Sequence, residues 1–264
     1  MCTLHTHSLG IAYVLVWLGL AWLGLTLFVG FCFYNNAAVA ARTALRHPGV
    51  NRVLILDWDV HHGNGIQDIL YEDPDVMYVS LHRHGNDFYP GTGAADETGR
   101  GAGAGYNVNV SWEEKALGDA DYLAAFDLVV DPIARSFDPD LVIIAAGFDA
   151  AEGDPLGGMR VTDQGYALMT DRLTRLAGGK CVAALEGGYG LTATASAAAS
   201  TLSALLGFAT PPLSSRRRPK RSSVELLSKV IDAHRKYWPV LGSEEQEKKL
   251  RAAFKSTQVV GVSS

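Results

Sequence analysis

The stretch LDWDVHHGNG, residues 56–65, concentrates side chains that bind metal ions or move protons. Asp57, Asp59 and His61 alternate along it, and His62 follows directly. The apolar run VLIL leads into these residues, so we expect a strand that ends in them. Alternate residues of an extended segment share one face. Asp59 and His61 can therefore bind one ion together while Asp57 supports them from behind.

Two further polar clusters follow apolar runs later in the chain. Asp149 comes directly after LVIIAAG, and Glu186 and Tyr189 come after CVAAL. Gly187 and Gly188, between them, let the backbone approach a ligand closely. One histidine and two aspartates form an oxygen-rich donor set with room for water, as a catalytic zinc ion needs, and iron or cobalt suits the same donors. Together these clusters predict a metal site.

The elements that must position these residues alternate along the chain. Short apolar runs predict buried strands, and amphipathic stretches between them predict helices. The runs are 53–56, 76–81, 141–147 and 181–186, and the amphipathic stretches include 116–136 and 162–176. This order is typical of a mostly parallel sheet covered on both faces. We therefore predict an α/β fold in three α/β/α layers, with ligands beyond the carboxyl ends of the strands.

Composition and charge narrow the class of protein. A chain of 264 residues, 48% hydrophobic, is long enough for an enzyme-sized domain. Its three cysteines lack C-x-x-C spacing, which argues against a disulfide framework or a cysteine-bound zinc site. Residues 42–213 carry 11 basic and 23 acidic side chains, a net charge of −12. Such a body does not suit direct nucleic-acid binding, and it either attracts a cationic, lysine-rich substrate or is simply a solvated acidic surface.

Two segments are typical of loops or linkers. The glycine-rich residues 91–105 lack the lysine and serine of a phosphate-binding loop, and no helix start follows them, which favours a flexible loop near a site. Residues 214–264 carry 12 basic and 5 acidic side chains, a net charge of +7. They begin with SSRRRPKRSS, which indicates either a nuclear-import signal or a basic surface linker, followed by a charged C-terminal helix.

The N-terminus has an unusual composition. No charged residue precedes Arg42, and residues 11–30 are twenty apolar or small residues. Their length predicts a membrane-spanning helix. The lack of a positively charged start argues against a cleavable signal peptide. A third interpretation is that non-coding sequence has been translated into the start of this chain.

Three motifs in the same order resemble one family. D-W-D-V-H-H-G-N-G, A-G-F-D-A-x-x-G-D-P-L-G and L-E-G-G-Y together resemble the zinc-dependent histone deacetylases of class II and their bacterial acetylpolyamine amidohydrolase relatives. The similarity runs from Gly30 to residues 230–241. It divides the chain into an apolar segment 1–30, a partial catalytic domain 31–213, and a basic linker with a C-terminal helix, 214–264. It implies an arginase/deacetylase-like fold from which the early strands are missing.

The resemblance assigns a role to each motif. Asp59, His61 and Asp149 would bind zinc, and the Tyr189 hydroxyl would stabilise the oxyanion that forms on the acetyl carbonyl. By the same resemblance, Phe31 and Tyr89 would form the walls of the acetyl-lysine channel. Asp57, Ser80 and Leu81 would bind a structural potassium ion. The implied substrates are acetylated lysine-containing proteins, among them histone tails. The implied setting is chromatin regulation and transcription repression in the nucleus, or the cytoplasm.

The chain departs from the family pattern before Phe31. The family carries a tandem histidine pair, P-G-H-H-A, shortly before G-F-C-F, and it uses that pair for proton transfer. Here the preceding residues are LGLTLFVG, and His5 and His7 lack the required spacing. We therefore expect a truncated or mis-assembled gene product rather than a protein anchored in a membrane through residues 11–30. Its function is either lysine deacetylation or, without turnover, that of a metal-binding interaction module; an acetylpolyamine amidohydrolase is a further alternative.

Overall fold

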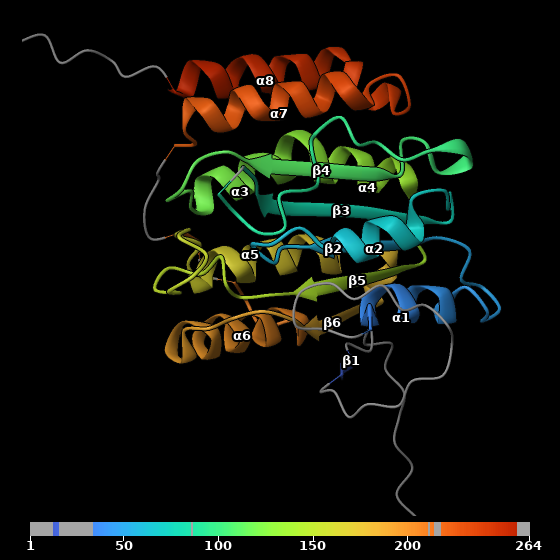
Figure 1. Ribbon diagram of the computed structural model, residues 1–264, viewed down its shortest axis with the longest axis horizontal. Helices are drawn as coiled ribbons and strands as arrows, with labels where there is room; N and C mark the ends of the chain where they lie inside the picture. The colour runs from blue at the N-terminus through green and yellow to red at the C-terminus, as the bar shows by residue number, and fades with distance from the viewer. Residues whose placement is uncertain (1–12, 16–33, 86, 211, 214–217, 258–264) are drawn as a thin grey trace, which may run out of the picture.

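A parallel sheet of six strands forms the centre of the molecule, in the order β1-β6-β5-β2-β3-β4 (Figure 1). The computed structural model describes residues 13–15, 34–85, 87–210, 212–213 and 218–257. The strands are β1 (Tyr13–Leu15), β2 (Val53–Asp57), β3 (Val76–Arg83), β4 (Asn107–Trp112), β5 (Leu141–Ala146) and β6 (Cys181–Leu185). The α-helices are α1 (Asn36–Ala44), α2 (Asn64–Leu70), α3 (Asp119–Ala125), α4 (Asp131–Phe137), α5 (Asp163–Thr174), α6 (Leu191–Leu205), α7 (Arg221–His234) and α8 (Glu244–Thr257). Shorter helical turns are η1 (Gly101–Gly103), η2 (Phe126–Val130, a π-helix), η3 (Ala177–Gly179) and η4 (Pro239–Gly242).

Helices cover both faces of the sheet and create two hydrophobic cores. Helices α1 and α2 pack on one face, against side chains such as Val53 and Ile55 of β2. The alternate residues Leu54 and Leu56 belong to the larger core on the other face, to which α3 to α7 contribute. Because β2 is buried on both faces, its sequence is continuously apolar up to Asp57. The α/β class and the layered parallel sheet predicted from such runs are confirmed.

Strand β4 was not among the predicted strands. Its sequence, NVNVSW, alternates polar and apolar residues, yet all six are buried. The side-chain amides of Asn107 and Asn109 both donate to Oε1 of Gln67, at 2.9 Å each. Since the N–H groups of these amides find an acceptor inside the protein, a polar face that the sequence presents as solvated lies in the interior.

The predicted membrane helix over residues 11–30 is not supported. Tyr13–Leu15 form the strand β1, which pairs in parallel with Val182–Ala184 of β6. The rest of that apolar run lies outside the described residues. Among the helices of the described ranges, none is both long and apolar enough to cross a bilayer. An apolar run also suits a buried strand, and composition alone does not separate the two.

The basic C-terminal part forms two helices, α7 and α8, which stack over the β4 side of the sheet (Figure 1). The carboxylate of Asp121, near the start of α3, holds α7 in place. It accepts hydrogen bonds from the Lys220 backbone N–H at 2.8 Å, the Ser223 hydroxyl at 2.7 Å and the Gly118 backbone N–H at 3.0 Å. Asp121 is buried, so these three bonds replace the water that its carboxylate would otherwise bind.

We expect Asp121→Asn to destabilise the fold. The amide nitrogen that replaces one carboxylate oxygen would face hydrogen-bond donors, which costs about 1–3 kcal/mol of unfolding free energy. Urea denaturation followed by circular dichroism measures the change. The matched control is Asp171→Asn, which removes an exposed ion pair with Arg175 and should cost less than about 1 kcal/mol. Equal costs at the two positions would contradict this role of Asp121.

Candidate active site

The carboxyl ends of β2 and β5 bring three predicted site residues together. Nδ1 of His61 lies 3.1 Å from Oδ1 of Asp59 and 2.9 Å from Oδ2 of Asp149. One ligand atom from each of these residues lies within 4.8 Å of the others. The residues are 88 to 90 positions apart between β2 and β5, and the parallel register of those strands places them side by side. We call Asp59, His61 and Asp149 the triad.

Backbone hydrogen bonds fix the two carboxylates of the triad. Oδ1 of Asp149 accepts from the Val60 N–H at 2.7 Å, and Oδ1 of Asp59 accepts from the His61 N–H at 2.8 Å. Oδ2 of Asp59 accepts from the Gly187 N–H at 3.0 Å. The loop after β2 therefore holds the side chain of Asp149, and the loop after β6 holds that of Asp59, so the three strand ends form one unit.

Two glycines make room for the carboxylates. A Cβ atom on Gly147 would lie 2.7 Å from Cβ of Asp59, and one on Gly187 would lie 2.6 Å from Oδ2 of Asp59 and 2.7 Å from Oδ2 of Asp149. All three distances are far inside ordinary van der Waals contact. The backbone at Gly187 therefore approaches the carboxylates of the triad closely, as the sequence predicts for that glycine. Gly147 is a second position at which the backbone comes this close to Asp59.

Asp57 lies behind the triad and does not join it. Its Oδ1 accepts from the Asp59 N–H at 3.0 Å, and its Oδ2 accepts from the Tyr78 hydroxyl at 2.8 Å. Burial raises the pKa of the Asp57 carboxyl well above its usual range, and the charge of Asp59 adds to that effect. Asp57 also pairs with Ser80 in the register of β2 and β3. Ser80 and Leu81 are themselves fully buried.

The electrostatics of the triad favour a positive charge at its centre. Burial opposes protonation of His61, but hydrogen bonds to Asp149 and Asp59 and the charges of both carboxylates raise its pKa to about 10. Burial also raises the pKa of Asp149 to about 7. Nδ1 carries one proton at most, yet two carboxylates face it. A cation bound by both carboxylates and a neutral imidazole would satisfy all three groups, so the donor set fits a divalent metal ion.

Aromatic rings surround His61. The Phe88 ring stacks on the imidazole, with centroids 4.9 Å apart and planes 7° apart. Tyr89 and Tyr189 each place a ring 6.5 Å from it, both edge-on, at 61° and 84°. Tyr89 is 58% exposed and Tyr189 is 38% exposed, so both rings border solvent. Phe31, the other predicted channel wall, lies outside the described residues.

Comparison with known proteins shows the family. The histone deacetylase domain model matches residues 26–205, more than half of the chain. The chain belongs to the histone deacetylase family. It is 50% identical over 219 residues, 80% of its length, to human "Histone deacetylase 7", and 50% identical over 216 residues, 81%, to "Histone deacetylase 15" of Arabidopsis thaliana. It spans 23% and 39% of these two curated relatives.

Solved structures support the same assignment. The chain matches the structure of the histone deacetylase Clr3 with a TM-score of 0.77 and 44% identity, covering 79% of this chain and 36% of that one. It matches the HDA15 HD domain with a TM-score of 0.78 and 48% identity, covering 85% of this chain and 61% of that one. The resemblance and the deacetylase-like fold expected from the motifs are thereby confirmed.

Sequence reasoning missed one ring in this candidate site. It named Tyr89 as an aromatic wall but not its neighbour Phe88, whose ring stacks on His61 and also receives the Arg83 guanidinium at 4.1 Å. The adjacent aromatic residues in DFYP were the signal in the sequence that could have identified Phe88.

Glu186, which the sequence analysis named with Tyr189 after β6, donates its backbone N–H to the Ala146 carbonyl at 3.2 Å and so joins β6 to β5.

His62 does not act beside His61. Its Nδ1 contacts the Thr92 hydroxyl at 2.8 Å. Its Nε2 contacts Oε1 of Gln67 at 3.0 Å, the same oxygen that accepts from Asn107 and Asn109. Burial lowers the pKa of His62 to about 4, against the opposing effects of Gln67 and Glu97. His62 is therefore a neutral structural histidine near pH 7.

We expect acid to weaken the fold through His62. The unfolded chain binds a proton at His62 near pH 6.5 and the native protein only near pH 4, so this stability is present above pH 6.5 and is lost as pH falls to 4. The difference corresponds to about 3 kcal/mol at most. Urea unfolding of the metal-free protein at pH 7 and pH 4.5 measures the loss. If the His62→Gln variant loses the same unfolding free energy between pH 7 and pH 4.5, groups other than His62 cause the loss.

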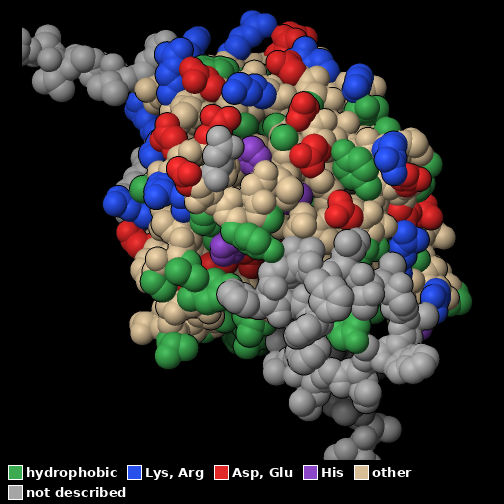
Figure 2. All heavy atoms as spheres, in the orientation of Figure 1, with side chains coloured by type: hydrophobic (Ala, Val, Ile, Leu, Met, Phe, Trp, Pro, Cys, Tyr) green, Lys and Arg blue, Asp and Glu red, His purple; other side chains and the backbone are tan. Residues whose placement is uncertain are grey.

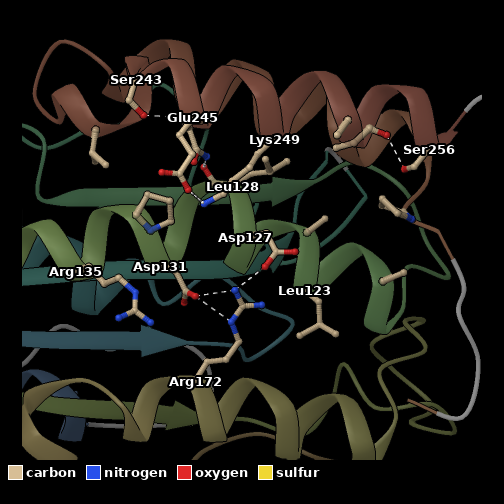
Figure 3. Close-up of a pocket in the computed structure, with 18 of the residues that line it drawn as sticks. Leu123, Asp127, Leu128, Asp131, Arg135, Arg172, Ser243, Glu245, Lys249 and Ser256 are labelled. Atoms are coloured by element: carbon tan, nitrogen blue, oxygen red, sulfur yellow. Dashed lines mark hydrogen bonds and ion pairs between the residues drawn. The ribbon is translucent and has the colours of Figure 1, made fainter. Parts of the chain in front are cut away.

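A separate hollow lies between α8 and the helices α3, α4 and α5 (Figure 3). It has a volume of about 1040 Å³, and no triad residue lines it. Arg172 crosses its floor and pairs with Asp127 at 2.5 Å and with Asp131 at 2.7 Å. The charges of Arg172, Asp127 and Asp131 are therefore paired with one another. No residue of the three deacetylase motifs lines this hollow.

Proposed function

We propose that this chain carries the metal-binding part of a protein lysine deacetylase site, which hydrolyses the acetyl amide of acetyl-lysine in histones or other proteins. The observation that carries the proposal is the triad of Asp59, His61 and Asp149, bordered by the phenol of Tyr189 at the ends of three strands. The deacetylase family model over residues 26–205 supports the same reaction class.

Asp59, His61 and Asp149 would hold the metal, for which we propose Zn²⁺. When bound, the ion supplies Lewis acidity that polarises the acetyl carbonyl and lowers the pKa of a water. His61 would bind it through Nδ1, the atom that both carboxylates face, and Phe88 stacks on the imidazole. The two carboxylates balance the charge of a divalent ion.

Tyr189 would act on the acetyl group directly. Its phenol donates a hydrogen bond to the carbonyl oxygen as negative charge develops there, which lowers the barrier by several kcal/mol in a site with little water. Tyr89 and Phe31 would exclude water by lining the path of the lysine side chain. Asp57, Ser80 and Leu81 would hold a structural K⁺ behind the triad, where Asp57 and Ser80 face each other across β2 and β3.

The proton step limits turnover by the chain of 264 residues. Hydrolysis needs one group to take the proton of the attacking water and to give a proton to the lysine amine. The family uses a tandem histidine pair for this, and the sole His-His pair of the sequence is His61 and His62. His61 belongs to the triad, and His62 is buried and neutral. We therefore infer metal binding with little hydrolysis, the behaviour of a metal-binding pseudoenzyme.

The substrate would be a cationic, acetylated protein segment. Residues 42–213 have a net charge of −12, which attracts the lysine-rich context of a histone tail. We propose action in the nucleus or the cytoplasm, with the basic residues 214–223 as a candidate import signal. An acetylpolyamine is the alternative cationic substrate, since its amide and charge have the same chemistry.

The experiment measures zinc content and hydrolysis on the same purified protein. We expect about one Zn²⁺ per chain, loss of that zinc in His61→Ala, and hydrolysis of an acetyl-lysine peptide close to background. Robust hydrolysis that is lost in Tyr189→Phe would establish a complete enzyme and refute the inferred lack of turnover. A chain that binds no zinc would refute the metal site itself. Acetylspermidine in a parallel assay separates the two substrate classes.

A further inference from the structure

The carboxylate of Asp154 joins two loops of the candidate site. It is almost fully buried, in the loop that follows β5 and carries Asp149. Its Oδ1 accepts from the Leu156 N–H at 2.8 Å and the Gly157 N–H at 3.0 Å. Its Oδ2 accepts from the Tyr189 N–H at 2.8 Å and the Gly190 N–H at 3.1 Å. One oxygen thus shapes its own loop, and the other holds the loop after β6.

The loop after β6 is anchored on both sides of a flexible residue. On one side, the Gly187 carbonyl accepts from the Phe148 N–H at 2.8 Å and its N–H donates to Asp59. On the other side, Asp154 holds Tyr189 and Gly190. Gly188 between these anchors has a φ of 136°, which residues with side chains rarely adopt. Without Asp154, rotation at Gly188 would move the backbone that carries the tyrosine.

The Tyr189 ring needs such a backbone anchor. It is 38% exposed, so packing restrains it less than it restrains a core ring. A displacement of about 1 Å at a group that contacts a reacting atom is enough to lower a rate by about a hundredfold. Fixing the N–H groups of residues 189 and 190 is therefore a direct way to fix the phenol.

We propose that Asp154 is a positioning residue that holds Tyr189 at the metal site through its backbone. The inference rests on the proposed role of Tyr189 as the hydrogen-bond donor to the carbonyl oxygen of the acetyl group, a position that a hydroxamate oxygen would occupy. A purely structural alternative is that Asp154 only shapes its own loop through Leu156 and Gly157. The two differ in one respect: positioning requires that the effect of Asp154 disappear when the Tyr189 hydroxyl is absent.

The test is a double-mutant cycle on the full chain loaded with Co²⁺, read out as the affinity for N-hydroxyoctanamide, an alkyl hydroxamate that chelates the metal. We expect Tyr189→Phe to weaken binding about tenfold, because one hydrogen bond to a charged oxygen is lost. We expect Asp154→Asn to weaken binding about three- to tenfold. The variant with both changes should bind no more weakly than Tyr189→Phe alone.

Each outcome decides between the two roles. An equal loss from Asp154→Asn in both backgrounds, or no loss in either, would overturn the positioning role and leave that of Tyr189 intact. If Tyr189→Phe itself changes nothing, the proposed role of Tyr189 fails, and the inference fails with it. If no hydroxamate or Co²⁺ binds to the parent chain, the metal site fails.

Two controls separate folding from positioning. Asp154→Ser retains a hydroxyl that can accept from its own loop but cannot reach residues 189 and 190, so it should repeat the loss seen with Asp154→Asn. It also carries the test if Asp154→Asn shows no cooperative unfolding. Asp121→Asn removes another buried carboxylate with three hydrogen bonds, and it should leave hydroxamate affinity within about twofold of the parent. The Co²⁺ absorption spectrum confirms an intact triad in each variant.

Discussion

Asp149→Asn is expected to abolish metal binding while leaving the chain folded. Asparagine has the same shape but no charge, so it removes one of two carboxylates that balance the ion. We expect affinity for Co²⁺ or Zn²⁺ to fall at least 100-fold, since even groups that only support ligands contribute 10- to 100-fold. Titration with Co²⁺, followed by its visible absorption, measures the loss.

The fold should tolerate this change better than the metal site does. Burial raises the pKa of Asp149 to about 7, which means that its charge costs stability above that pH in the metal-free protein. Stability from the protonated carboxyl is complete below the unfolded pKa near 4 and is lost as pH rises through about 7. A neutral amide removes that cost at pH 8, although it also weakens the contact with His61.

Thermal unfolding at pH 8 with and without Zn²⁺ therefore separates the two effects. Parent protein should be stabilised by added metal, whereas Asp149→Asn should melt at the same temperature in both conditions. Asp127→Asn changes an exposed carboxylate that pairs with Arg172 outside the triad, and it should behave like the parent. Metal-dependent stabilisation that persists in Asp149→Asn would show that the ion binds elsewhere.

Much of the sheet could be predicted because burial on both faces leaves a direct mark on the sequence. Strand β5 is apolar throughout and β2 is apolar up to Asp57, so each strand and its polar end were visible. Strand β4 was not, because the side-chain N–H groups of Asn107 and Asn109 donate to Gln67, a partner 40 and 42 positions away. The run that includes β1 was visible as apolar, but its pairing with β6 depends on a contact that no local pattern reveals.

The same distinction applies to the site. Asp59, His61 and Asp149 were predictable because each stands at the end of an apolar run, and parallel strands bring such ends together. The stacking of Phe88 on His61 joins residues 27 positions apart and depends on the course of the intervening loop. Asp154 belongs to a recognised motif, but only the folded loops show that its second oxygen holds Tyr189 and Gly190.

In the described residues, apolar side chains are exposed to solvent on the outer side of α6. Helix α6 contains no charged residue, and its exposed side carries Leu191 and Leu202, with the exposed Leu206 directly after it. Figure 2 shows hydrophobic side chains gathered at lower left, where α6 lies in Figure 1, whereas charged side chains gather over α7 and α8. An apolar helix on the outside of a soluble domain is unusual. Stability measurements on this chain will therefore depend on detergent and protein concentration, which should be held fixed across variants.

Gly147→Ala is expected to damage the metal site through a single methyl group. Gly147 follows β5 without a positive φ, so alanine is compatible with its backbone conformation. The added Cβ would lie 2.6 Å from Cγ and 2.7 Å from Cβ of Asp59. Since Cβ of Asp59 is fixed by its own backbone, either the strand end or the whole carboxylate must move. We expect at least a 100-fold loss of Co²⁺ affinity and about 1–3 kcal/mol of destabilisation.

A matched alanine and a second-site change test this cause. Gly242→Ala adds the same methyl group where nothing lies within 4 Å, so stability should hold or rise by about 0.5 kcal/mol and Co²⁺ affinity should not change. Combining Gly147→Ala with Asp59→Gly removes the colliding side chain, so stability should recover while metal binding stays lost. Recovery of both, or of neither, would mean that the methyl group acts through something other than its collision with Asp59.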